Sequence, residues 1–213
     1  SVKSSTLENA VNTAWNSGVV VVAAAGNSNN PSKTYPGAYT NVIAVAATNN
    51  LDQKAYFSSY GAKWVDVAAP GEYIFSTWKD FSSRSNPQPE CDLTGCYKYA
   101  SGTSMSTPMV SGVAGLVWST GYTSPSAVRT KIESTADQIT GTGTYWSKGR
   151  VNAANAVISQ LDVAVTRVVG DYHDQLQQYS LTGVAPAGTV KVRVQSSITC
   201  NTMKLDAFCL TIT

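Results

Sequence analysis

An unbroken apolar run at residues 19–25 (VVVVAAA) most constrains the fold. The run is too short for a helix, and no polar residue alternates with its apolar ones. Such a run is typical of a strand buried on both faces, as in a parallel sheet covered by helices. It ends in residues 26–31 (GNSNNP), which form a strong loop signal. Two further runs, residues 42–47 and 64–69, are predicted to be strands of the same α/β sheet.

Helices are predicted on either side of these runs. Apolar residues recur at helical spacing from Leu7 to Trp15, Ser5 and Glu8 have the spacing of a capping box, and Gly18 stands at the expected stop. A second helix, residues 104–119, is apolar on nearly every side and is therefore predicted to be buried. Ser124 precedes a proline and begins a third helix. A short last helix is predicted over residues 152–159, and residues 79–99 are predicted to be a polar loop.

The pattern changes near residue 160. Residues 162–168 and 189–194 alternate between apolar and polar side chains with period two, and residues 205–213 do so more loosely. This alternation predicts half-buried antiparallel strands. We therefore expect an α/β domain over residues 1–160 and a small all-β module, a partial sandwich, over residues 161–213.

Charge and composition exclude few partners. Charged residues make up 13% of the chain, hydrophobic residues 43%, and the formal net charge is +2. This charge is too small to indicate nucleic acid or an acidic partner. No long apolar run predicts a membrane span, and no signal peptide is visible, although the chain begins at Ser1 as if partway through a longer protein.

The four cysteines form two local pairs, Cys91 with Cys96 and Cys200 with Cys209. Neither pair has the spacing and nearby histidine of a zinc site, so no metal site is predicted. Short loops favour the two local disulfides among the three possible pairings, and disulfides would indicate a secreted, extracellular protein. The alternative is four reduced thiols in a cytosolic protein.

Two polar segments next to buried elements carry candidate chemistry. In residues 102–108 (GTSMSTP), Ser104 lies where the chain enters the predicted buried helix, at the positive end of its dipole. Gly102 lets a substrate carbonyl approach the backbone, and Pro108 is expected in the first turn. Asn27 follows the carboxyl end of a buried strand, where ligands bind in open α/β sheets. Alone, Ser104 is more simply a helix cap and Asn27 a turn residue, but together they indicate an acyl-transfer site.

Several segments resemble the subtilisin-like serine protease family in order and approximate spacing. They are residues 24–28 (AAGNS), 35–36 (YP), 57–61 (FSSYG), 68–71 (AAPG), 102–108 (GTSMSTP) and 149–153 (GRVNA). The resemblance covers residues 1–158. Ser106 and Met109 depart from the family pattern, which usually has alanine and histidine there. The resemblance implies the three-layer fold of that family, a parallel sheet flanked by helices, and a serine endopeptidase acting on peptide or protein substrates.

The resemblance also implies roles for individual residues. Ser104 is implied to be the nucleophile and Asn27 the side-chain donor to the oxyanion. Substrate-binding positions are implied for Ala24, Ala25, Gly26, Thr34, Gly102 and Thr103. No cofactor is required by this chemistry, although family members often carry structural calcium.

The acid and base of such a protease are not visible in the sequence. In the family they precede the nucleophile, so the catalytic Asp and His are expected in an N-terminal half of the domain that lies outside this chain. The only histidine, His173, lies in the β module and is expected to be an exposed loop residue; Asp52 and Asp66 have no motif support. We therefore expect this chain alone to be inactive. The alternative is a protease-like scaffold that binds peptides or surfaces without cutting them.

Overall fold

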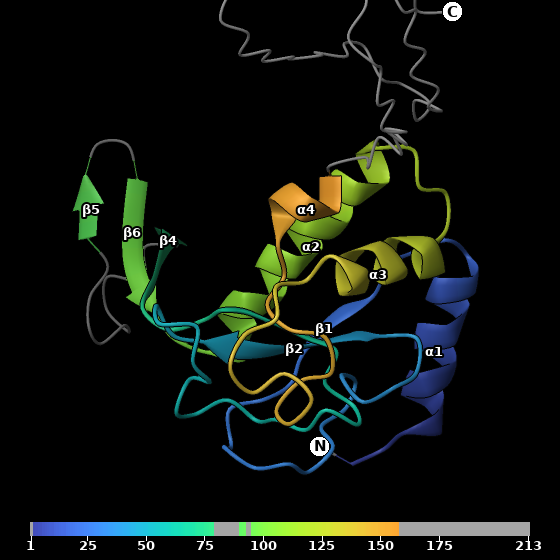
Figure 1. The fold of residues 1–213 in the computed structure, drawn as a ribbon, viewed down its shortest axis with the longest axis horizontal. Coiled ribbons are helices and arrows are strands. Elements are labelled where there is room, and N and C mark those ends of the chain that lie inside the picture. The colour runs from blue at the N-terminus through green and yellow to red at the C-terminus, as the bar shows by residue number, and fades with distance from the viewer. Residues whose placement is uncertain (1, 79–89, 93–94, 158–213) are drawn as a thin grey trace, which may run out of the picture.

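A three-stranded parallel sheet carries the predicted apolar runs. The computed structural model describes residues 2–78, 90–92 and 95–157. Its first sheet has the order β1-β2-β3, with β1 at Val22–Ala24, β2 at Ile43–Thr48 and β3 at Val67–Pro70 (Figure 1). Ala23 pairs with Ala44, and Ala46 pairs with Ala68, both in parallel register. The three predicted strands are therefore confirmed, with bounds shifted by up to three residues.

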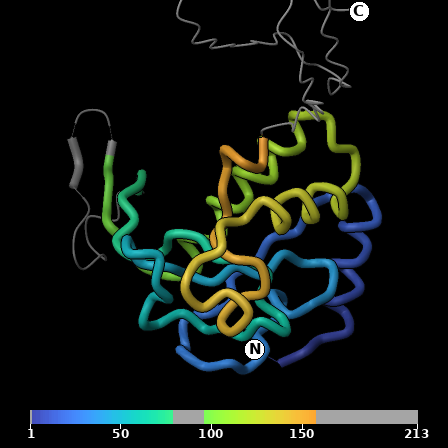
Figure 2. The backbone as a smooth tube through the Cα atoms, viewed as in Figure 1, coloured from blue at the N-terminus to red at the C-terminus, as the bar shows by residue number. Residues whose placement is uncertain are grey.

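Alternate side chains of this sheet enter two different cores. Ile43, Val45 and Val67 pack on one face with three helices, α2 (Thr103–Ser119), α3 (Pro125–Ser134) and α4 (Ala153–Val157). Ala46 and Ala68 pack on the other face with Trp146. Residues 147–151 run beside β3 at the edge of this sheet, where the Ala68 N–H donates to the Gly149 carbonyl at 2.8 Å (Figure 2). The α/β fold of a parallel sheet flanked by helices is thus confirmed.

The first helix, α1, spans Ser5–Asn16 and packs through Val11 against Tyr39 and Val42. Its N-cap is Ser4, whose hydroxyl accepts from the Leu7 N–H at 3.4 Å. The capping box predicted at Ser5 and Glu8 is therefore wrong by one residue. Gly18 follows the C-cap with a φ of +90°, as the predicted stop requires.

The helices on the other face are α2 at Thr103–Ser119, α3 at Pro125–Ser134 and α4 at Ala153–Val157. As predicted, the Ser124 hydroxyl caps α3, accepting from the Ala127 N–H at 3.2 Å. The prediction that α2 is buried on nearly every side is wrong. Leu116 and Trp118 are 49% and 38% exposed, because among the described residues the sheet, α3 and α4 cover only part of this helix.

A second, antiparallel sheet was not predicted. It has the order β4-β6-β5, with β4 at Ile74–Trp78, β5 at Glu90–Asp92 and β6 at Gly95–Ala100, and it projects from the body of the domain (Figure 1). Part of the predicted polar loop at residues 79–99 is therefore strand. Within it, Cys91 lies directly opposite Cys96 in the ladder.

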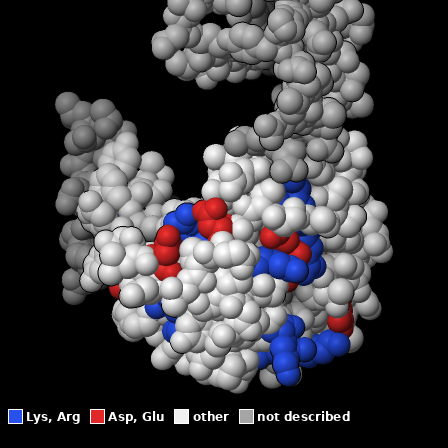
Figure 3. All heavy atoms as spheres, viewed as in Figure 1, with Lys and Arg blue, Asp and Glu red and all other residues white. Residues whose placement is uncertain are grey.

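Charged side chains are sparse on the face seen in Figure 3, where small groups contain both signs. Among the described residues, no helix is long and apolar enough to cross a bilayer. The predicted β module, residues 161–213, and its cysteines Cys200 and Cys209 lie outside the described residues.

Candidate active site

The start of α2 presents Ser104 to solvent. Gly102 is the N-cap, so Ser104 is the second residue of the helix, where the unpaired N–H groups and the dipole favour negative charge. Pro108 is the sixth residue and lies inside the helix, not in its first turn as predicted. Lacking an N–H, it cannot donate to the Ser104 carbonyl four residues earlier.

Asn27 is held in one orientation by Thr103. Its Oδ1 accepts from both the backbone N–H and the hydroxyl of Thr103, each at 2.9 Å. The Thr103 hydroxyl in turn accepts from the Gly26 N–H at 3.1 Å. Because two donors converge on Oδ1, the amide Nδ2 must point the other way. No hydrogen bond to a described residue uses that Nδ2.

Gly102 keeps the space around Nδ2 open. A Cβ added to Gly102 would lie 3.4 Å from Asn27 Nδ2, in van der Waals contact. Asn27 and the helix start are thus brought together across 76 residues of sequence. An amide donor beside a helix-entry serine can stabilise the negative oxygen of a tetrahedral intermediate, with the Ser104 N–H as second donor.

Small residues lie close to the backbone of the segment that precedes Asn27. Thr34, predicted from sequence to bind substrate, lies beside Gly26, since a Cβ on Gly26 would be 3.4 Å from the Thr34 Oγ1. A Cβ on Gly37 would lie 3.0 Å from the Ala24 carbonyl oxygen and 3.3 Å from that of Thr34. The structure therefore brings Ala24, Gly26 and Thr34 together, and it adds Gly37, which no sequence pattern indicated.

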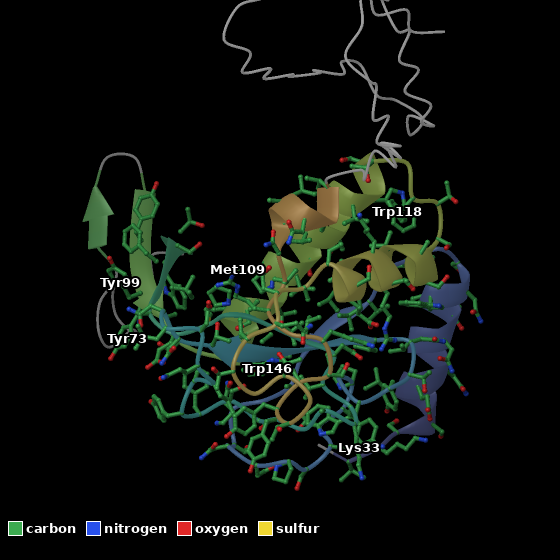
Figure 4. All side chains as sticks on the ribbon, viewed as in Figure 1. Lys33, Tyr73, Tyr99, Met109, Trp118 and Trp146 are labelled. Atoms are coloured by element: carbon green, nitrogen blue, oxygen red, sulfur yellow. The ribbon has the colours of Figure 1, made fainter. Side chains whose placement is uncertain are left out.

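A groove of about 410 Å³ runs from Ser104 between α2 and the antiparallel sheet. Figure 4 shows Met109 on α2 and Tyr99 and Tyr73 at the base of that sheet. Lys98 lies in the groove wall with its Nζ 5.1 Å from the centre of the Trp78 ring. No sequence pattern indicated this groove, because the strands β4 and β6 that form its wall were not predicted.

The carboxylates considered as a catalytic acid are engaged elsewhere. Asp66 binds the Arg129 guanidinium at 2.7 Å and accepts from the Ala44 N–H at 2.7 Å. Burial raises the pKa of the Asp66 carboxyl, an effect that Arg129 and the Ala44 N–H oppose. Asp52 binds Arg150 at 2.6 Å. His173 lies outside the described residues, which contain no histidine and no cluster of three or more acidic, His or Cys side chains that could hold a metal ion.

Comparison with known proteins identifies the family. The sequence model of the subtilase family matches residues 1–171. The chain belongs to the subtilase family. It is 54% identical over 156 residues to thermitase of Thermoactinomyces vulgaris, covering 73% of this chain and 50% of thermitase. It is 50% identical over 153 residues to a thermophilic serine proteinase of Bacillus sp. (strain AK1), covering 71% of this chain and 34% of that protein.

A solved structure agrees with the fold of this subtilase chain. A protease from Pseudoalteromonas arctica PAMC 21717 matches with a TM-score of 0.62 and 35% identity, covering 73% of this chain and 47% of that one. The subtilase chain thus spans about half the length of thermitase, and less of the other relatives named here.

Proposed function

We propose that the chain is part of a serine endopeptidase that cleaves peptide bonds through an acyl-enzyme on Ser104. The Ser104 hydroxyl attacks the scissile carbonyl and passes its proton to a base. The C–N bond then breaks, the leaving amine takes that proton, and water hydrolyses the ester to release the acid and restore the hydroxyl. The reaction requires no cofactor. Structural calcium stays an expectation from the family resemblance, and no step depends on it.

The orientation of the Asn27 amide is the observation that carries this proposal. Thr103 fixes Oδ1 with two donors, so Nδ2 is free to donate where charge develops on the substrate oxygen. A side chain that only shaped a turn would not require this arrangement. Ala24, Gly26 and Thr34 would then form one wall for the side chain on the acyl side of the cleaved bond.

The base and acid are proposed to come from residues outside this chain. Family order places them before the nucleophile, and the chain spans about half of thermitase. The exposed side of α2 leaves room for a further part of the protein to pack there, because a hollow of about 240 Å³ lies between α2 and residues 18–22. Its lining consists of Gly18, Val20, Val22, Ser111, Ala114, Gly115 and Trp118.

We also propose a disulfide between Cys91 and Cys96, and with it a secreted protein. The two residues are opposite each other in an antiparallel ladder. Such pairs have Cα atoms about 4.5–5.5 Å apart, within the range that a disulfide spans. The pairing of Cys200 with Cys209 is proposed from sequence spacing alone.

Labelling with a fluorophosphonate tests the nucleophile. The protein that contains these residues together with an upstream acid and base should be labelled at Ser104, whereas its Ser104→Ala variant should not. The 213-residue chain alone should label far more slowly, because it lacks the base. If the longer protein bound peptides without any labelling, the chain would be a binding scaffold instead.

Kinetics of Asn27→Ala test the oxyanion donor. Removing one donor of this kind lowers kcat by about 10²- to 10³-fold. We expect KM to change little, because the lost hydrogen bond forms mainly in the transition state. An unchanged kcat would remove Asn27 from this role.

A further inference from the structure

The ammonium group of Lys54 occupies a site made of neutral oxygen atoms and aromatic rings. Its Nζ donates to Asn29 Oδ1 at 2.7 Å, to the Ala55 carbonyl at 3.1 Å and to the Ser58 carbonyl at 3.3 Å. It also lies 5.2 Å from the ring centre of Tyr60 and 5.8 Å from that of Tyr145. Oxygen acceptors combined with ring faces are the usual surroundings of a bound ammonium group.

No carboxylate among the described residues balances this charge, since none of their ion pairs involves Lys54. Burial lowers the pKa of the Lys54 ammonium, so the site carries a desolvation cost. The backbone of Lys54 is fixed as well, by an antiparallel bridge to Thr48 and by the bond from the Ala55 N–H to the Ala47 carbonyl at 2.9 Å. The charge is therefore held at a defined point next to β2.

One of the groups around Lys54, Asn29, belongs to the loop that carries Asn27. Asn29, the 2.7 Å acceptor, lies two residues after Asn27 and has a φ of +47°, a left-handed conformation that asparagine tolerates. Its N–H donates to the Phe57 carbonyl at 2.9 Å. The Ser59 N–H donates to the Gly26 carbonyl at 2.8 Å, and the Ser59 hydroxyl accepts from the Ser28 N–H at 3.2 Å.

Lys54 also reaches a third segment through Tyr145. The rings of Tyr60 and Tyr145 are 5.3 Å apart in an edge-on arrangement, and the Gly61 N–H donates to the Tyr145 carbonyl at 2.7 Å. One ammonium group thus lies where the loop after β1, the segment at residues 55–61 and the loop around Tyr145 meet. Removing it would leave the acceptors of the first two segments without their common donor and the Tyr145 ring without its cation.

We propose that Lys54 is a positioning residue for the oxyanion donor, a tethered cation that fixes the loop carrying Asn27. The inference rests on the proposed function, because it assigns Lys54 to the geometry of that reaction. Thr103 holds the Asn27 side chain from one side, and Lys54, through Asn29, holds the Asn27 backbone from the other. Preorganised donors stabilise a transition state only when their position is fixed, so a looser loop lowers turnover.

Kinetics of Lys54→Met in the full catalytic protein test this role. Methionine keeps an unbranched side chain but removes the charge. We expect kcat to fall about tenfold, less than for loss of the donor itself, with KM changed less than twofold. The control is Lys63→Met, which removes an exposed positive charge nine residues further along the chain and should leave kcat unchanged. Wild-type kcat in Lys54→Met, or an equal loss in Lys63→Met, would overturn the proposal.

Restoring a cation should restore turnover. Lys54→Arg keeps a charge that can contact carbonyl oxygens and ring faces, so we expect it to recover most of the lost kcat. Lys54→Ala should respond to added n-propylammonium, which supplies the three carbons and the ammonium lost from the side chain, whereas the isosteric neutral n-propanol should have no effect. A structural role of the aliphatic stem alone would give the same response to both additives.

Amide hydrogen exchange separates this proposal from the proposed function. In Lys54→Met, the Ser28, Asn29 and Tyr60 amides should exchange faster, while those of β2 stay unchanged. Asn29→Gly, which tolerates the left-handed backbone and removes the side chain that carries the Oδ1 acceptor, should give the same pattern if Lys54→Met folds poorly. Amide exchange needs no catalysis, so unchanged protection would refute the positioning role of Lys54 even if Ser104 were unreactive. An unlabelled Ser104, in turn, would refute the proposed nucleophile without changing the exchange result.

Discussion

The parallel and antiparallel sheets meet next to Ser104, yet different forces hold them. All six residues of β2 and the first three of β3 are buried, because side chains on both faces enter a core. In β4 the three central residues are exposed, and Phe75 is 50% exposed although its ring lies 4.8 Å from that of Tyr99. The first sheet is held by burial on two sides, whereas the second depends on its backbone ladder and on ring contacts.

The two sheets hold different parts of the candidate active site. Asn27 follows β1 and is tied to Thr103, so its position depends on the buried sheet. The groove wall formed by β4 and β6 reaches the site through Gly71 and Gly102, where the Gly102 N–H donates to the Gly71 carbonyl at 2.8 Å. Substitutions in the parallel sheet should therefore lower turnover. Substitutions in the antiparallel sheet should affect only that sheet, unless they displace Gly71.

Among the changes that compare the two sheets, the largest effect is expected for Thr103→Val in the full catalytic protein. Valine has the shape of threonine but no hydroxyl, so Asn27 Oδ1 loses one of its two donors and the Gly26 N–H loses its acceptor. We expect kcat to fall about 10²-fold with KM nearly unchanged. Thr103→Ser, which keeps the hydroxyl, is the matched control and should retain most activity. Equal losses in both variants would mean that packing, and not the hydroxyl, positions Asn27.

The next effect concerns Gly71, where the two sheets join. An added Cβ there would contact Ser106 Oγ and lie 2.7 Å from Ala47 Cβ and 2.9 Å from the Gly102 oxygen. Two of these neighbours cannot move without the backbone, so we expect Gly71→Ala to lower the free energy of unfolding by about 2 kcal/mol. Denaturant unfolding measures it, with Ser76→Ala in β4 as a control of similar size. Stability like that of Ser76→Ala would show that the two sheets are not rigidly joined.

The same difference in burial decides which strands can be predicted from the sequence. Continuous apolar runs indicated β2 and β3 because both faces of these strands are buried. The run at residues 19–25 gave a strand that begins only at Val22, since pairing starts opposite Ile43. β4 and β6 were missed, because ladder bonds and cross-strand rings leave no regular alternation of apolar and polar residues in Ile74–Trp78 or Gly95–Ala100.

The site was predicted where residue types are adjacent in sequence and missed where only the fold joins them. Ser104 and Asn27 stand in short motifs. The fixing of Asn27 by Thr103 could not be predicted, because these residues are 76 positions apart. The contact of Gly37 with the Ala24 carbonyl depends on backbone geometry. Lys54 carries no motif, and its oxygen neighbours are mostly backbone carbonyls, which no side-chain pattern reveals.

A smaller, local effect is expected in the antiparallel sheet. The Phe75 ring is stacked 5.5 Å from that of Tyr97 and lies 4.8 Å from that of Tyr99. Phe75→Ala should remove about 1 kcal/mol of aromatic contact, which corresponds to roughly fivefold faster amide exchange in β4 and β6. The amides of β2 should not change. Thr77→Ala, at an exposed position of the same strand, is the control, and faster exchange in β2 as well would mean that the two sheets open together.

The smallest effect is expected at Asp137, which links the loop after α3 to Arg150 and Asn152. The Asn152 amide donates to both Asp137 oxygens, at 2.9 and 3.0 Å, and Arg150 lies 2.6 Å away. The Asn152 hydrogen bonds, followed by that from Arg150, lower the pKa of the Asp137 carboxyl. A lowered pKa means that the folded state favours the ionised form. Its contribution to stability is therefore present above the unfolded value of about 3.9 and is lost as pH falls through the lower folded value.

Asp137→Asn should accordingly reduce the free energy of unfolding at pH 7 by only about 0.5 kcal/mol, because the pair is partly exposed and screened by salt. The difference from wild type should shrink below about pH 4, where the unfolded carboxyl takes up its proton. Denaturant unfolding at several pH values measures both, and Glu72→Gln, just before β4, serves as a control that also removes one negative charge. A difference that grew as pH fell would mean that the carboxylate is not stabilised by Asn152 and Arg150 in the folded protein.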